Sequence, residues 1–198
     1  MTLPRGIVLA SASPRRRELL VQVGLAVEVV PADVDETVLP GEFPERHVIR
    51  LSEVKAMTVA RRSEVAGRWF IGSDTVVVRD GSILGKPSGT EDAAAMLRSL
   101  SGRSHEVVSG YAVYDRDSGR ILSGAVVTRV WFKLLTEQEI AGYLATGEPF
   151  DKAGAYAIQG LGAFMVPRIE GSYPNVVGLP LCEVIAALEE CGAVNLFS

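Results

Sequence analysis

Short apolar runs alternate with segments of helical periodicity along most of the chain. Apolar runs bounded by Gly, Pro or Asp are typical of buried strands, whereas apolar residues three and four positions apart are typical of an amphipathic helix. The predicted strands are Ile7–Ala10, Ala26–Val30, Trp69–Val78, His105–Asp115 and Ile121–Leu135. The first predicted helix begins at Pro14. The other predicted helices are Pro44 to about Val65, Glu91–Leu100, Glu137–Ala145 and Leu181–Glu190.

Residues typical of element ends support these boundaries. Ser13 stands where a helix cap is expected, directly before a proline in the preferred first position. Gly24 is expected to end the same helix. Asp80-Gly81 is a hairpin turn signal, and Gly72-Ser73-Asp74-Thr75 predicts an interruption of the strand before it.

The order of elements predicts an α/β fold with a mixed twisted sheet and flanking helices. The 198 residues contain no linker, repeat or low-complexity stretch. This length is enough for a single domain over residues 1–198, divided into two lobes.

Composition narrows the classes of function. Hydrophobic residues make up 47% of the chain, yet no apolar run reaches the roughly 20 residues that span a membrane. A net charge of −4 argues against a stable nucleic-acid partner, because such proteins favour a basic surface. Cys182 and Cys191 form no CxxC or metal-binding spacing, which predicts reduced thiols in a cytoplasmic protein.

The stretch SASPRRRELL places three arginines where a strand meets a helix. The start of a helix offers unpaired N–H groups and the positive end of the helix dipole. Ser11 and Ser13 can donate hydroxyls there, and Arg15 and Arg16 can grip phosphate bidentately. Cations at this end oppose the dipole, which indicates a bound anion. An ordinary capped helix with a solvated basic face is the alternative.

Asp74 stands within the otherwise apolar segment IGSDTVVV. A carboxylate in a strand is costly unless it is paired, metal-bound or functional. We expect Asp74 at a sheet edge facing a cleft, as a general base for water or as a metal ligand. A turn carboxylate that caps a local N–H is the alternative. The hydroxyl of Thr75 is placed to reach a ligand or to stabilise the strand.

Of two lysines near these segments, Lys86 is a candidate phosphate contact. Lys86 lies in GSILGKPSG, which resembles a P-loop but lacks its first glycine and has proline after the lysine. A plain turn lysine is the alternative for Lys86. Lys55 lies on the border of the apolar face of the second helix, where a snorkelling side chain is the simpler interpretation.

The acidic segment Asp33-Val34-Asp35-Glu36 is either solvent-exposed or, with Asp74, a ligand set for a divalent cation. In EPFDKAGAYAIQGLGAF, small residues imply close backbone approach, and the amide of Gln159 is a candidate for reading a base edge. A structural glutamine in a tight loop is the alternative. His47 and His105 have no ligand spacing, and we expect packing or surface roles for both.

Taken together, LASASPRRRELL, GSDTVV, LGKP, SGRSHEVVSG and EPFDKAGAYAIQGLGAFMVPRIEGSYPNVVGLPL resemble the Maf family of nucleoside triphosphate pyrophosphatases, in order across nearly the whole chain. The resemblance implies a two-lobed α/β fold related to the inosine triphosphatases, with the site in a central cleft. It implies hydrolysis between the α- and β-phosphates with a divalent cation (Mg²⁺, Mn²⁺ or Co²⁺). The segment DKAGAYAIQG resembles the branch that acts on dTTP and UTP.

The resemblance also assigns roles to residues. Asp74 matches the family's proposed proton acceptor, and Arg15, Thr75 and Gln159 match its substrate-discriminating positions. The positions that line the phosphate site are matched by Ser11, Arg16, Lys55 and Lys86, with Glu36 as an acidic residue beside it. Glu36 and Asp74 are the expected metal ligands.

The expected function is therefore hydrolysis of dTTP and UTP, or of modified pyrimidine nucleotides, to the monophosphate and pyrophosphate. The alternative is a nucleotide-binding regulator of septum formation whose hydrolysis is slow or incidental. We expect a homodimer, because symmetric dimers are the commonest soluble oligomers.

Overall fold

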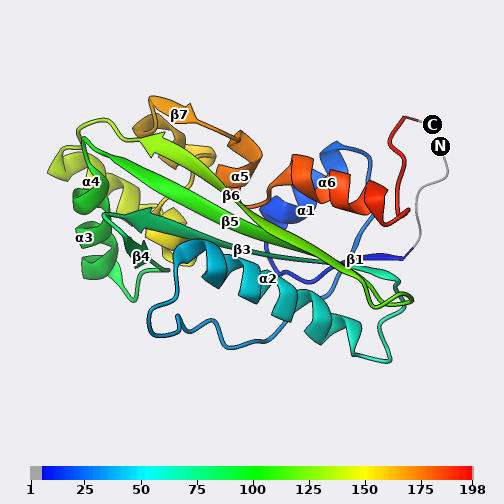
Figure 1. Ribbon diagram of the computed structural model, residues 1–198. Coiled ribbons are helices and arrows are strands. Elements are labelled where there is room, and N and C mark those ends of the chain that lie inside the picture. The colour runs from blue at the N-terminus through cyan, green and yellow to red at the C-terminus, as the bar shows by residue number, and fades with distance from the viewer. Residues whose placement is uncertain (1–5, 198) are drawn as a thin grey trace. The chain divides into compact units, whose positions relative to one another are not determined.

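The computed structural model describes residues 6–197 and has the mixed α/β architecture that the sequence predicts (Figure 1). The strands are β1 (Ile7–Leu9), β2 (Glu28–Val29), β3 (Trp69–Arg79), β4 (Ser82–Leu84), β5 (Ser104–Asp115), β6 (Ile121–Trp131) and β7 (Arg168–Glu170). The α-helices are α1 (Pro14–Gln22), α2 (Pro44–Ala60), α3 (Thr90–Leu100), α4 (Glu137–Ala145), α5 (Tyr173–Val177) and α6 (Leu181–Glu190). Three short 3₁₀ helices follow α4: η1 (Glu148–Asp151), η2 (Ala153–Ala155) and η3 (Gly160–Met165).

The seven strands form one mixed sheet in the order β2-β1-β3-β5-β6-β7, with β4 paired to β3. β1 pairs in parallel with β2 and with β3, whereas β4 and β7 pair antiparallel with their neighbours. Asp80 and Gly81 both have positive φ in the turn between β3 and β4, which confirms the predicted hairpin.

The chain divides into two compact units. The first comprises residues 6–74, 109–126 and 178–197, and the second comprises residues 75–108 and 127–177. The long strands β3, β5 and β6 each contribute residues to both units.

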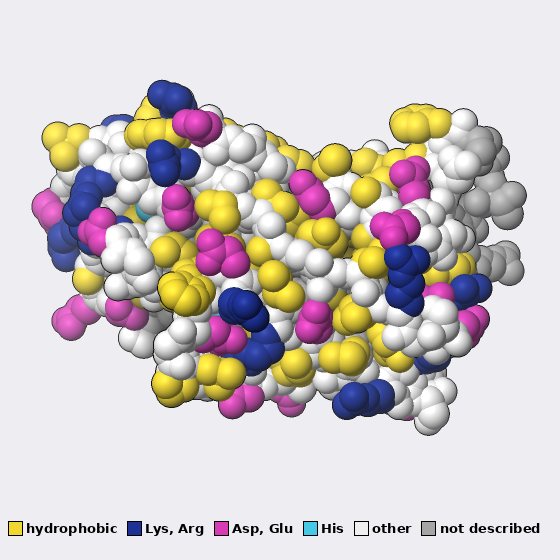
Figure 2. All heavy atoms as spheres, viewed as in Figure 1, with side chains coloured by type: hydrophobic (Ala, Val, Ile, Leu, Met, Phe, Trp, Pro, Cys, Tyr) yellow, Lys and Arg dark blue, Asp and Glu magenta, His cyan; other side chains and the backbone are white. Residues whose placement is uncertain are grey.

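The exposed surface carries charges of both signs. On the face of each unit that Figure 2 shows, Lys and Arg side chains are interspersed with Asp and Glu rather than gathered into one basic patch. Among residues 6–197, no helix is both long enough and apolar enough to cross a membrane.

In the first unit, α2 covers one face of the sheet and α1 and α6 lie on the other (Figure 1). Ala56 and Val59 of α2 are fully buried against Phe70 of β3. A Cβ atom at Gly72 would overlap the carbonyl oxygen of Ser52 and lie 2.9 Å from the amide nitrogen of Ala56. Glycine at this position therefore lets the backbone of α2 approach the sheet directly.

In the second unit, α3 and α4 pack together over a core that includes a ring cluster. His105, Phe132 and Tyr156 meet edge to face with centroids 4.7–5.3 Å apart, and His105 Nε2 lies 2.7 Å from Tyr156 Oη. Burial lowers the pKa of His105 to about 4, so its ring is neutral at pH 7. The packing role predicted for this histidine is confirmed.

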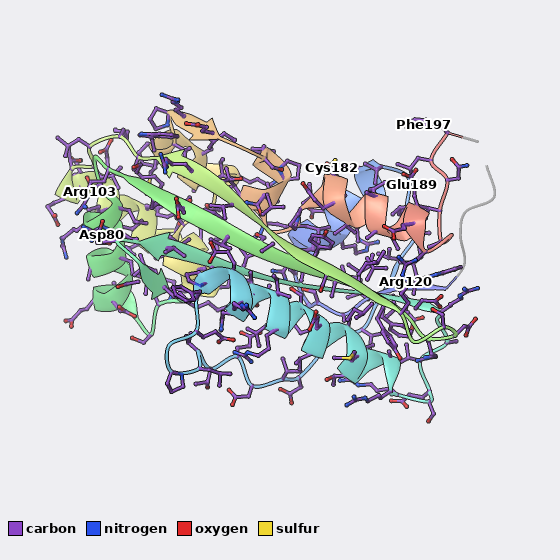
Figure 3. The ribbon with its side chains drawn as sticks, viewed as in Figure 1. Asp80, Arg103, Arg120, Cys182, Glu189 and Phe197 are labelled. Atoms are coloured by element: carbon purple, nitrogen blue, oxygen red, sulfur yellow. The ribbon has the colours of Figure 1, made fainter. Side chains whose placement is uncertain are left out.

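An ion pair ties the turn after β3 to the start of β5. Arg103 Nη2 donates to Asp80 Oδ2 at 3.0 Å, and the two side chains point toward each other (Figure 3). Both side chains are largely exposed, so the pair contributes little to stability.

Three expectations about these elements are wrong. β3 continues through residues 72–75 without the predicted interruption. It is also not an edge strand: β1 pairs with residues 69–71 and β4 with residues 77–79, so Asp74 lies between two pairings of an inner strand. α2 ends at Ala60 rather than near Val65, because turns at Arg62 and Val65 return the chain to the core.

Substituting Gly72 by alanine should destabilise the fold severely, because the new methyl group would meet helix backbone rather than a movable side chain. We expect a loss of about 4 kcal/mol or more in the free energy of unfolding, measured by urea denaturation. The matched control is Gly142→Ala in α4, where a Cβ has nothing within 4 Å. That change should stabilise the protein by about 1 kcal/mol. A Gly72→Ala variant as stable as the wild type would contradict the proposed close approach.

Candidate active site

A buried lysine on α2 holds two carboxylates together in the first unit. Lys55 Nζ lies 2.7 Å from Asp74 Oδ1 and 2.6 Å from Glu36 Oε1. Lys55 and Asp74 are buried, while the Glu36 side chain is half exposed. The snorkelling interpretation of Lys55 is therefore wrong, because its ammonium is paired inside the protein rather than extended into solvent.

The alternation of side chains along β3 explains why Asp74 reaches α2. Gly72 and Asp74 lie on the same face of the strand, toward α2, and Ser73 lies on the opposite face. Ser73 Oγ donates to the carbonyl oxygens of Gly110 and Gly178, at 2.8 and 3.2 Å. The close approach at Gly72 thus brings Lys55, one turn further along α2 from Ser52, within reach of Asp74.

Sequence reasoning missed His47, which lies on the same face of α2 as Lys55. His47 is buried, and its Nε2 lies 4.0 Å from Asp74 Oδ2, beyond direct hydrogen-bond range. Its Nδ1 lies 3.0 Å from Glu42 Oε2. The eight-residue spacing from Lys55, two helical turns, was the one signal that could have placed His47 beside Asp74.

Glu42 is held by Arg50. Arg50 Nε and Nη2 donate to Glu42 Oε1 and Oε2 at 2.6 and 2.8 Å. This two-pronged contact is the main reason that the pKa of Glu42 falls to about 2. Glu42 is therefore ionised at neutral pH, and its carboxylate can only accept in the hydrogen bond that it makes with His47 Nδ1.

The turn between β1 and α1 is tied to the same strand. Arg16 donates from Nε to the Gly178 carbonyl at 2.7 Å, and from Nη1 to Ser11 Oγ and the Ser73 carbonyl, both at 2.9 Å. Burial lowers the pKa of Arg16, while the nearby carboxylates of Asp74 and Glu36 act in the opposite direction. Arg16 therefore stabilises the turn and also places a positive charge beside the carboxylates of Asp74 and Glu36.

Arg15 differs from Arg16. Its Nε is buried with no hydrogen-bond partner among the described residues. A buried donor without a partner is costly, so this atom is a candidate contact for an external acceptor. Pro14 begins α1 as predicted, but Ser13 makes no side-chain cap bond.

The second unit contains the remaining candidates. Thr75 follows Asp74 on β3 and is partly buried, as is Gln159, which precedes η3. Lys86 is exposed in the loop after β4. The amide of Gly154 donates to the carbonyl of Gly85 at 3.0 Å, which places the loop of Lys86 beside the segment that leads to Gln159.

Comparisons with known proteins identify the family of the chain. A family model described as Maf-like protein matches residues 6–191. The chain belongs to the Maf family.

Relatives of this Maf chain are similar over nearly its full length. A dTTP/UTP pyrophosphatase of Syntrophotalea carbinolica is 66% identical over 193 residues, covering 98% of this chain and 88% of the relative. A dTTP/UTP pyrophosphatase of Geotalea uraniireducens is 58% identical, covering 98% of this chain and all of the relative. One of Anaeromyxobacter dehalogenans is 52% identical, covering 94% of each chain.

The donor set of this Maf chain suits a hard divalent cation held jointly with phosphate. No group of three or more His, Cys, Asp or Glu side chains with metal-binding geometry occurs within residues 6–197. Glu36 and Asp74 do converge, since each has an oxygen within 2.7 Å of the same ammonium. Magnesium is commonly bound by one or two carboxylates together with substrate phosphates and water, so two carboxylates suffice.

The pair of Glu42 and Arg50 should make stability depend on pH in the acid range. The pKa of Glu42 is lower in the folded protein than in the unfolded chain, so its contribution is complete above about pH 5 and is lost as the pH falls toward 2. The difference in free energy of unfolding between wild type and Glu42→Gln should therefore shrink over this range. Urea denaturation at several pH values measures it. Glu45→Gln in the first turn of α2 is the control, and a difference independent of pH would contradict the assignment.

Proposed function

We propose that this Maf-family chain is a nucleoside triphosphate pyrophosphatase that hydrolyses dTTP and UTP to the monophosphate and pyrophosphate. Relatives at 52–66% identity are dTTP/UTP pyrophosphatases and match almost the whole chain. The observation that carries the proposal is the buried Asp74 carboxylate, held 2.7 Å from Lys55 in a unit that also positions several arginines.

Asp74 is the group that takes a proton from the attacking water. Lys55 Nζ fixes Oδ1 of this carboxylate. As the water oxygen bonds to the α-phosphorus, its proton passes to Asp74 and the bond from the α-phosphorus to the bridging oxygen breaks. Pyrophosphate leaves with the electron pair of that bond.

Cationic groups offset the charge of the triphosphate. Arg15 offers its unpartnered Nε, and Arg16 with Ser11 shapes the turn at the start of α1. Lys86 supplies an exposed cation in the second unit. Such a reaction needs chiefly positioning and electrostatic stabilisation, which explains why no nucleophilic side chain is required.

A divalent cation would complete the charge balance. Glu36 and Asp74 would hold it, and it would offset negative charge on the phosphate oxygens as bonds change. Mg²⁺, Mn²⁺ and Co²⁺ are the candidates. Lys55 sets the distance between the two carboxylates, since it contacts both.

Gln159 reads the pyrimidine edge in this proposal. Its amide oxygen accepts from N3–H of uracil or thymine, and its NH₂ group donates to the neighbouring carbonyl. Arg15 and Thr75 complete the contacts with the nucleotide. A site built on such hydrogen bonds rejects bases that leave its polar groups unpaired.

A nucleotide-binding regulator of septum formation is not favoured. Such a regulator needs the basic residues but not a buried carboxylate beside them, and the relatives named above are enzymes. We place the enzyme in the cytoplasm as a homodimer, where both of its cysteines remain free thiols. The net charge of −4 favours a small-molecule substrate over nucleic acid.

Asp74→Asn should abolish pyrophosphate release while nucleotide binding stays measurable, because the amide keeps the shape of the side chain but cannot accept the proton. Pyrophosphate release from dTTP and binding by calorimetry measure the two properties. The exposed Asp117→Asn is the control for a change of charge. Wild-type turnover in Asp74→Asn would contradict the role of Asp74 as proton acceptor.

Turnover should also require a metal and a pyrimidine. Chelation with EDTA should remove activity, and Mg²⁺, Mn²⁺ or Co²⁺ should restore it.

Across a panel of triphosphates, dTTP and UTP should be hydrolysed fastest, and Gln159→Glu should weaken both by removing the NH₂ donor. Equal turnover of purine and pyrimidine triphosphates would contradict the role given to Gln159.

A further inference from the structure

The loop that carries Gln159 is tied to α4 and η1 by one tyrosine and one glutamate. Tyr143 Oη donates to Glu148 Oε1 at 2.8 Å. The same hydroxyl accepts from the amide of Ala157 at 3.2 Å. Tyr143 thus contacts the loop at Ala157, two residues before Gln159.

The same glutamate contacts the loop after Gln159. Glu148 Oε2 accepts from the amide of Leu161 at 3.2 Å, and Oε1 accepts from the amide of Gly162 at 3.1 Å. Gln159 is therefore bracketed on both sides by hydrogen bonds to two side chains that themselves bond to each other. Tyr143 is buried and Glu148 is partly buried, and the bond from the Ala157 amide to Tyr143 is buried as well.

Two glycines of the loop show how closely it is packed on the pair. Gly160 has φ of +67°, and a Cβ there would lie 2.8 Å from Glu148 Oε2. A Cβ on Gly162 would lie 2.7 Å from Tyr143 Oη. The loop therefore leaves no space for side chains between its backbone and the pair.

The charge of Glu148 suits this role. Burial raises the pKa of Glu148, but the hydrogen bonds from Tyr143, Gly162 and Leu161 outweigh it, so the pKa is lowered overall. An ionised carboxylate is a pure acceptor, which matches its three donors.

We propose that Tyr143 and Glu148 are positioning residues for base selection, because they hold the 157–162 loop in the conformation from which Gln159 distinguishes uracil from cytosine. This inference rests on the proposed function, in which Gln159 contacts the base. Neither Tyr143 nor Glu148 touches the nucleotide in this scheme.

The chemistry of an amide makes such support necessary. A glutamine amide presents an oxygen acceptor and an NH₂ donor side by side, with nearly the same shape in both orientations. One orientation pairs with the N3–H and carbonyl of uracil, whereas the reverse pairs with the N3 and amino group of cytosine. Discrimination therefore requires that the side chain be held in place, and a mobile loop would permit both pairings.

The experiment compares kcat/KM for UTP with kcat/KM for CTP in wild type, Glu148→Gln and Tyr143→Phe, at saturating Mg²⁺. The ratio of the two constants is independent of the amount of folded enzyme, so a merely structural role would not move it. Glu148→Gln should lower the UTP/CTP ratio by about tenfold, since a glutamine oxygen cannot satisfy all three donors. Tyr143→Phe, which keeps the packing, should lower it by a smaller factor.

The controls separate this inference from the proposed function. Glu137→Gln removes a carboxylate in the first turn of α4 whose side-chain hydrogen bonds within the described residues go to Arg98, and it should leave the ratio unchanged. Gln159→Glu should change the ratio directly. If it does so while Glu148→Gln and Tyr143→Phe keep the wild-type ratio, the inference is overturned and the proposed function stands. If wild type releases no pyrophosphate from UTP, or if Gln159→Glu leaves the ratio unchanged, the proposed function fails and the inference falls with it.

Discussion

The approach of α2 to the sheet is the constraint on which the first unit depends. Gly72 of β3 and Gly110 of β5 each face helix backbone, and a Cβ at either position would overlap a carbonyl oxygen of α2. Without that approach, Lys55 would lie too far from Asp74 to pair with it. Two absent side chains therefore decide where the charged groups of the candidate site meet.

Charged side chains are concentrated around the contact between α2 and the sheet, and almost every one of them has an ion-pair partner. Burying an ion is costly unless it is paired and hydrogen-bonded. Removing one partner of such a pair leaves an unpaired buried charge, which destabilises the fold. Lys55 offsets Asp74 and Glu36, while Arg50 offsets Glu42. The polar groups are therefore held in place before any ligand arrives, which is the arrangement that electrostatic catalysis requires.

The second unit is organised on a different principle. In the proposal above, its contribution to base selection rests on backbone amides that donate to Tyr143 and Glu148, rather than on buried ion pairs. The residue proposed to contact the base and the residues proposed to hold it are thus distinct, and only the first is evident from its chemistry.

Much of the fold could be read from local patterns. The bounds of α4 and α6, the hairpin at Asp80-Gly81 and the start of α1 at Pro14 agree with the sequence prediction, because helical periodicity, turn residues and proline act within a few positions. Asp74 was also found as a candidate, since a carboxylate in an apolar strand is unusual by itself, whereas Lys55 was assigned to the site by the resemblance to the Maf family.

What the sequence alone determined was the set of elements and the residue types able to do the chemistry. Only the tertiary structure decided which of them meet. It placed Asp74 on an inner strand, set His47 near it, made Arg16 a brace of the β1–α1 turn and joined Glu148 to the loop of Gln159. Sheet order and the packing of α2 on glycines join segments distant in the chain, and no local pattern encodes such contacts.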